Sequence, residues 1–76
     1  MSAERAAYCD AAGEEVFLHR SLLGLTQAQL AQQIGVARRS VSRWESGRCL
    51  PSIVHLDKLR KMAARKRRAL IHGIAA

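Results

Sequence analysis

Long apolar runs are missing from this sequence of 76 residues. No stretch approaches the roughly 20 apolar residues of a membrane-spanning helix. The N-terminal region also lacks the apolar segment of a secretory signal peptide. We therefore expect a cytoplasmic protein without a membrane partner. A chain of this length is expected to form one small domain, whose core leaves little room for a large enclosed active site.

Cysteine and histidine are scarce, and none is spaced as a redox or metal site. Cys9 and Cys49 form no CxxC motif, so two unpaired thiols are expected in a reducing compartment. His19, His55 and His72 show no HxxxH spacing, and we assign them to the surface or the core edge, with pH sensing as the minor alternative. A nucleophile with an adjacent base and a phosphate-binding loop are missing too. The sequence predicts no enzyme, metal or cofactor.

Acidic residues are rare in the second half of the chain. From Arg38 to Arg68 there are eleven lysines or arginines against only two carboxylates, Glu45 and Asp57. The part before it is slightly acidic, so the formal charge of +7 is concentrated on one half. Such asymmetry indicates an anionic partner, most commonly a nucleic acid, with a membrane surface as the rival.

Helix boundaries can be placed from glycines and caps. Residues 1–10 show no clear period and are expected to form a loosely ordered N-terminal arm, followed by one domain over residues 11–76. From Ala11 or Ala12, apolar residues recur at helical spacing as far as Gly24, a natural left-handed stop.

A second helix begins with a capping box and ends after two turns. Thr26 is the expected N-cap, and Gln29 three residues later is its reciprocal partner. Gly35 ends this helix, and a third must fit before Gly47. In that third helix the residues at helical spacing, Ala37, Val41 and Trp44, form a narrow apolar arc. The opposite side is polar and basic: Arg38, Arg39, Ser42 and Arg43.

The last part of the chain is helical without interruption by glycine or proline. After a loop that closes at Pro51, Ser52 is placed to cap a fourth helix. This helix either continues to His72 as one bent helix or breaks near Ala63 into a fifth. The expected fold class is all-α, with four or five helices.

Two short helices joined by a glycine turn, the second basic on its exposed side, form a helix-turn-helix. Residues Leu25 to Leu59 resemble the Cro/C1-type helix-turn-helix family, also called XRE, which includes the lambdoid phage repressors. The matching motifs are LTQ, LA-x-x-I-GV, VSRWE-x-G and PS. The resemblance implies a lambda-repressor-like domain whose third helix enters the major groove of double-stranded DNA.

The resemblance also implies roles for individual side chains. The residues expected to read bases are Arg38, Arg39, Ser42 and Arg43, since an arginine fork fits guanine O6 and N7 together. The residues expected to bind phosphate are Gln27, Ser40 and Arg48. For the arginines the alternative is phosphate contact alone, and for Gln27 and Arg48 it is an ordinary solvated side chain.

A structural set is expected to hold the third helix in place. Trp44 is the expected core anchor, packed with Val41 against Leu30 and Ile34. Arg20 and Glu45 match an ion pair that ties the first helix to the third in the lambdoid repressors. Two residues depart from the family pattern, because Ala37 cannot cap the third helix and Arg60 stands where small apolar residues are usual.

The C-terminal stretch RKRRALIHGIAA combines basic and apolar residues. The run Arg65 to Arg68 is either a solvated face or a supplementary phosphate contact. We expect Leu70, Ile71 and Ile74 to form a dimer interface within a C-terminal dimerisation helix. Lambdoid-type domains bind as dimers, with recognition helices about 34 Å apart.

These features favour a sequence-specific transcriptional regulator of the helix-turn-helix type. The simplest form is a homodimeric repressor of its own small operon, such as a phage, anti-CRISPR or restriction–modification operon, bound to an inverted-repeat operator. The alternative is an antitoxin that binds a toxin protein and autoregulates its operon.

Overall fold

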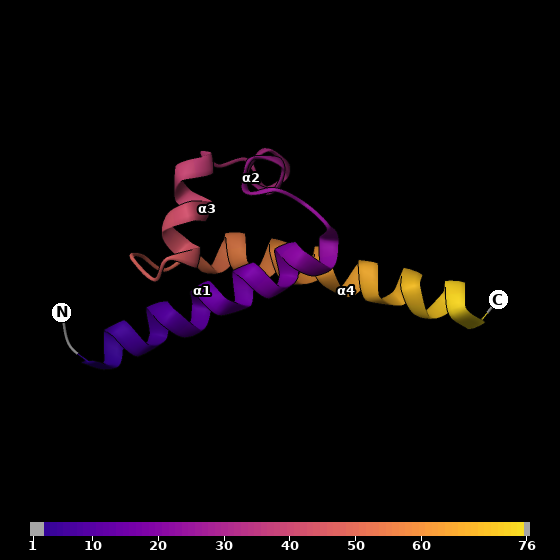
Figure 1. The fold of residues 1–76 in the computed structure, drawn as a ribbon, viewed down its shortest axis with the longest axis horizontal. Coiled ribbons are helices and arrows are strands. Elements are labelled where there is room, and N and C mark those ends of the chain that lie inside the picture. The colour runs from indigo at the N-terminus through magenta and orange to yellow at the C-terminus, as the bar shows by residue number, and fades with distance from the viewer. Residues whose placement is uncertain (1–2, 76) are drawn as a thin grey trace.

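The computed structural model describes residues 3–75, and side chains are described for residues 3–73. This part of the chain folds into four α-helices joined by short loops (Figure 1). The helices are α1 (Ala3–Leu23), α2 (Gln27–Ile34), α3 (Arg38–Glu45) and α4 (Ile53–Ala75). The molecule is elongated, with extents of 49 × 24 × 18 Å. The long helices α1 and α4 cross, and α2 and α3 pack on one side of the crossing (Figure 1). The all-α prediction is confirmed.

Helix α1 begins at Ala3, eight residues before the expected start at Ala11. The loose arm that we expected over residues 1–10 is therefore helical from residue 3 onward. Alanine-rich sequence favours a helix, and one turn of this segment is fixed by Cys9, which is buried. Because Cys9 is the one buried residue among residues 3–12, the segment shows no apolar period.

The helix caps that the sequence predicts at Thr26, Gly35 and Ser52 are present in the structure. The Thr26 hydroxyl accepts a hydrogen bond from the Gln29 backbone N–H (3.1 Å), and the Gln29 side chain accepts one from the Thr26 N–H (2.9 Å). Gly35 closes α2 with a left-handed φ of 91°. Ala37 caps α3 without a side-chain hydrogen bond. The Ser52 hydroxyl accepts the His55 N–H at 3.2 Å, which starts α4.

Helix α4 is one continuous helix, which settles the alternative that the sequence left open. Its first half contributes Leu59 and Ala63 to the interior, where both are fully buried. From Arg65 to Gly73 every residue is exposed. This end of α4 projects beyond the rest of the fold (Figure 1, yellow). None of the helices in the described part of the chain is long and apolar enough to cross a membrane.

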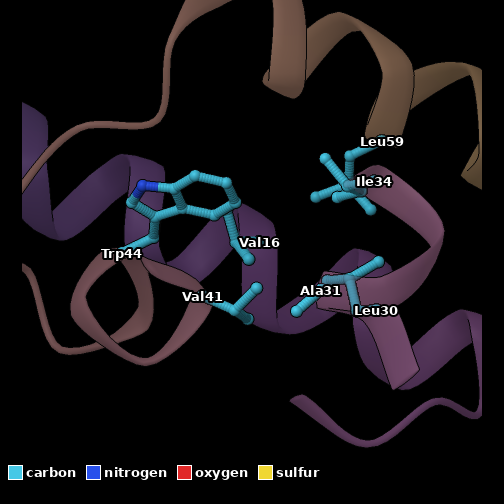
Figure 2. Packing of buried hydrophobic residues seen from close by; sticks show 7 residues of the cluster. All are labelled: Val16, Leu30, Ala31, Ile34, Val41, Trp44 and Leu59. Carbon is cyan, nitrogen blue, oxygen red and sulfur yellow. The ribbon is translucent and has the colours of Figure 1, made fainter. Parts of the chain in front are cut away.

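The core brings all four helices together around α3 (Figure 2). Its members are Val16, Leu30, Ala31, Ile34, Val41, Trp44 and Leu59. Trp44 is only 5 % exposed, and its ring lies 5.7 Å from that of His55 at the start of α4. Buried aromatic rings of this kind dominate the packing of small cores. The orientation of α3 is thus fixed by residues from the three other helices.

Arg60 does not disturb the packing of α4, because it pairs with a carboxylate of α1. Its Nε and Nη2 donate to the two Glu15 oxygens at 2.6 and 2.9 Å. The His19 ring is 3.0 Å from the same carboxylate. The Arg60 hydrogen bonds, and to a smaller degree those of His19, lower the pKa of Glu15 from 4.5 to about 2.

The Glu15 pair makes stability depend on pH in acid. Because folding lowers the pKa of Glu15, its contribution is complete above about pH 4.5 and is lost as the pH falls towards 2. Arg60 is half exposed, so we expect Glu15→Gln to cost only about 1 kcal/mol at pH 7. Urea denaturation should show this cost vanishing near pH 2. A Glu15→Gln cost that stays constant with pH would contradict the assignment.

Candidate nucleic-acid interface

The outer face of α3 forms an open, basic hollow. Arg38 and Arg39 come from its first turn, and Ser42 and Arg43 follow one turn later. Ser46 and Arg48, from the loop after the helix, complete the lining. All four arginines are exposed, and no carboxylate of the described residues lines the hollow. A concave surface of one charge sign concentrates anions near it.

The two faces of α3 differ sharply in chemistry. Val41 and Trp44 point into the core, where they are 0 % and 5 % exposed (Figure 2). Arg39 and Arg43, four positions apart, share the solvent side of the helix, and Arg38 is exposed beside them. The structure thus brings together the four residues expected to read bases, together with Arg48.

The C-terminal end of α3 is held by an ion pair. Arg20 of α1 donates from Nε and Nη2 to the two Glu45 oxygens, at 2.6 and 2.8 Å. Its Nη1 donates to the Leu25 carbonyl at 3.0 Å. The hydrogen bonds to Glu45 raise the pKa of Arg20. Both side chains are largely covered, with 18 % and 10 % of their surface exposed. Such bidentate pairs fix geometry as well as charge.

Gln27 belongs to this network, which sequence reasoning missed. Its Nε2 donates to the Glu45 Oε1 at 3.2 Å, so the first residue of α2 is connected to the last residue of α3. Gln27 and Ser40, two of the expected phosphate ligands, are half-buried and do not line the arginine hollow. Of the three expected phosphate ligands, the hollow includes Arg48.

Gly13 is a second residue that sequence reasoning passed over. It is buried in α1, where a Cβ would overlap the Trp44 carbonyl oxygen and lie 3.1 Å from that of Glu45. The backbones of α1 and α3 therefore approach more closely than any larger residue permits. An isolated glycine within a helical pattern is the signal that could have indicated this contact.

The comparisons with known proteins agree with this geometry. A helix-turn-helix family matches residues 19–65, which include α2, α3 and the first half of α4. The chain is also 38 % identical over 48 residues to a protein of Methanothermobacter thermautotrophicus (strain Delta H) named as an uncharacterized HTH-type transcriptional regulator; the match spans 63 % of this chain and 70 % of that protein. No solved structure matches significantly. The chain belongs to the Cro/C1-type (XRE) helix-turn-helix family of DNA-binding transcriptional regulators.

Proposed function

We propose that this regulator binds a specific double-stranded DNA site by inserting α3 into the major groove. The observation that carries the proposal is the arginine face of α3, exposed opposite a buried tryptophan. The residues in contact with base edges are Arg38, Arg39, Ser42 and Arg43. A guanidinium fork donates to guanine O6 and N7 together, so these arginines favour guanine-containing sites.

Phosphate contacts flank this reading helix in the proposed complex. Arg48 lies in the same hollow and supplies charge without sequence preference. Gln27 and Ser40 stand in the first turns of α2 and α3, where the helix dipole attracts anions. The hydrogen bond to Glu45 holds the Gln27 amide in place before DNA arrives.

The active species in this proposal is a homodimer that represses its own small operon from an inverted-repeat operator. Leu70 and Ile71, near the end of α4, are 46 % and 62 % exposed and are the proposed interface. The side chain of Ile74, the third expected interface residue, lies outside the described ones. Occupation of a promoter by the dimer blocks transcription, as suits a phage, anti-CRISPR or restriction–modification operon.

Replacement of Arg39 by alanine tests base reading. With an operator selected from a random DNA library, we expect Arg39→Ala to lose about 1–3 kcal/mol of affinity and to accept other bases at one base pair. The control Arg48→Ala should weaken operator and random DNA by the same factor, since it contacts phosphate. Fluorescence anisotropy at fixed salt measures both. Equal losses on operator and random DNA for Arg39→Ala would contradict base reading.

The second candidate function is that of an antitoxin, and the exposed apolar end of α4 favours it. In that case a toxin protein covers Leu70 and Ile71 in place of a second copy. Sedimentation of the purified chain, with and without the product of the adjacent gene, separates the two functions. A dimer alone supports the repressor, whereas a monomer that pairs with the neighbour's product supports the antitoxin.

A further inference from the structure

Apolar residues return on the inner side of α4 beyond the point where the core ends, after Lys66 and Arg67 interrupt them. Leu56, Leu59, Ala63 and Leu70 follow one another at spacings of three, four and seven residues, which place them on one side of the helix. Leu59 and Ala63 are covered by the other helices, whereas Leu70 is 46 % exposed. Ile71 beside it is 62 % exposed. The described part of the chain thus leaves Leu70 and Ile71 largely uncovered.

The positive charge beside Leu70 and Ile71 determines which surface can cover these two residues. Arg65, Lys66, Arg67 and Arg68 precede the apolar pair, and all four are exposed. Two α4 ends packed on each other would place like charges side by side, which destabilises a helix pair. The complementary surface must therefore carry carboxylates together with small apolar residues.

Helix α1 presents such a surface on its outer side. Its members recur at spacings of three and four residues: Glu4, Ala7, Ala11, Glu14 and Leu18. All five are exposed, and they lie opposite the buried face of Cys9, Gly13 and Val16. Among residues 3–73, neither Glu4 nor Glu14 takes part in an ion pair. Alanines allow a second helix to approach closely.

The shape of the molecule lets two copies satisfy both surfaces at once. The beginning of α1 and the end of α4 lie at opposite ends of the long axis (Figure 1). A two-fold axis perpendicular to that long axis brings each α4 end beside the α1 of the other copy. The contact is isologous and closed, so it produces a dimer without further assembly.

We infer that the end of α4 docks on the outer face of α1 in a second copy of the chain, in two equivalent contacts. Leu70 and Ile71 then pack against Ala7 and Ala11 of the partner copy, which lie one turn apart on α1. Lys66 and Arg67 lie near the carboxylates. The inference rests on the homodimer of the proposed function, and it specifies the surface that the dimer uses.

Charge exchange tests this contact, with sedimentation equilibrium as the measurement. The first variant, Lys66→Glu with Arg67→Glu, reverses the two α4 charges that we assign to the contact, while Arg65 and Arg68 stay basic. The second, Glu4→Lys with Glu14→Lys, makes α1 basic. Each alone should weaken the dimer at least tenfold, whereas an equimolar mixture should form heterodimers. A chain with all four substitutions should regain the wild-type dimer, and circular dichroism verifies that every variant is folded.

The possible results distinguish an error in the proposed α4–α1 contact from an error in the proposed DNA-binding function. If the α1 variant forms a dimer as strong as the wild type, α1 is not the partner surface and the inference is overturned. A wild-type chain that stays monomeric also overturns it, together with the homodimer. The ratio of affinities for an operator half-site and random DNA reports on α3 separately, so sequence-specific binding by such a monomer would leave the DNA-binding proposal standing.

Discussion

Replacing Glu45 by alanine is expected to lower the free energy of unfolding by about 3 kcal/mol, because it leaves a largely covered guanidinium without its carboxylate partner. Three donors lose their acceptor: Nε and Nη2 of Arg20 and Nε2 of Gln27. The stability of a whole small domain is only about 5–15 kcal/mol, so this loss is a large share of it. The melting temperature should fall by roughly 12–24 °C for a loss of about 3 kcal/mol.

The matched control removes an exposed ion pair of similar length. Lys61 lies 3.0 Å from Asp57, and both are more than half exposed. Lys61→Ala should therefore cost less than about 0.5 kcal/mol. A second test replaces both partners of the Arg20–Glu45 pair, Arg20→Met with Glu45→Leu, which should recover most of the stability because no charge is left unpaired. Calorimetry that gives equal melting temperatures for Glu45→Ala and Lys61→Ala would refute this account.

The parts of the fold that depend on residues close together in the sequence could be predicted from the sequence. The capping box at Thr26 and the glycine at position 35 set the bounds of α2 through local hydrogen bonds and a single backbone angle. The arc of Val41 and Trp44 determines which side of α3 is buried, because helical periodicity needs no knowledge of the partner helices. The same arc places the arginines on the solvent side, whereas their contacts with DNA stay predictions.

The extents of α1 and α4 could not be predicted in the same way. Residues 3–10 are held by one buried side chain, Cys9, which is too little to produce a period. At the other end, α4 continues beyond Ala63, its last core residue. The residues of this extension, 65–73, are all exposed. Helical propensity extends both segments, while their amphipathic patterns are incomplete because few of their residues pack against the rest of the described chain.

Contacts that join residues of three different helices could not be predicted from the sequence either. The family resemblance implied the pair of Arg20 with Glu45, but nothing in the spacing indicated that Gln27 shares the same carboxylate oxygen. That bond depends on the angle between α2 and α3, which follows from the shape of the core. Gly13 is a similar case, because its importance appears only when the carbonyls of α3 are placed against α1.

Gly13→Ala is expected to destabilise the domain, although alanine normally stabilises a helix. In an open helix the change gains about 0.5–1 kcal/mol. At position 13 the new methyl overlaps the backbone carbonyl of Trp44, so α1 must move away from α3. Overpacking of this kind costs about 1–3 kcal/mol, and a rigid backbone neighbour favours the upper part of that range. The shift also loosens Cys9 and Val16, which are buried on the same face of α1.

Gly73 provides the matched control, because it lies in α4 with nothing within 4 Å of an added Cβ. Gly73→Ala should raise the free energy of unfolding, or leave it unchanged if the helix end frays, while Gly13→Ala lowers it. Urea denaturation of the two single variants measures the difference, which we expect to be about 2–4 kcal/mol from the opposing effects. Stabilisation of both variants to the same degree would show that α1 and α3 do not approach closely at Gly13, and the support of α3 by α1 would then have to be abandoned.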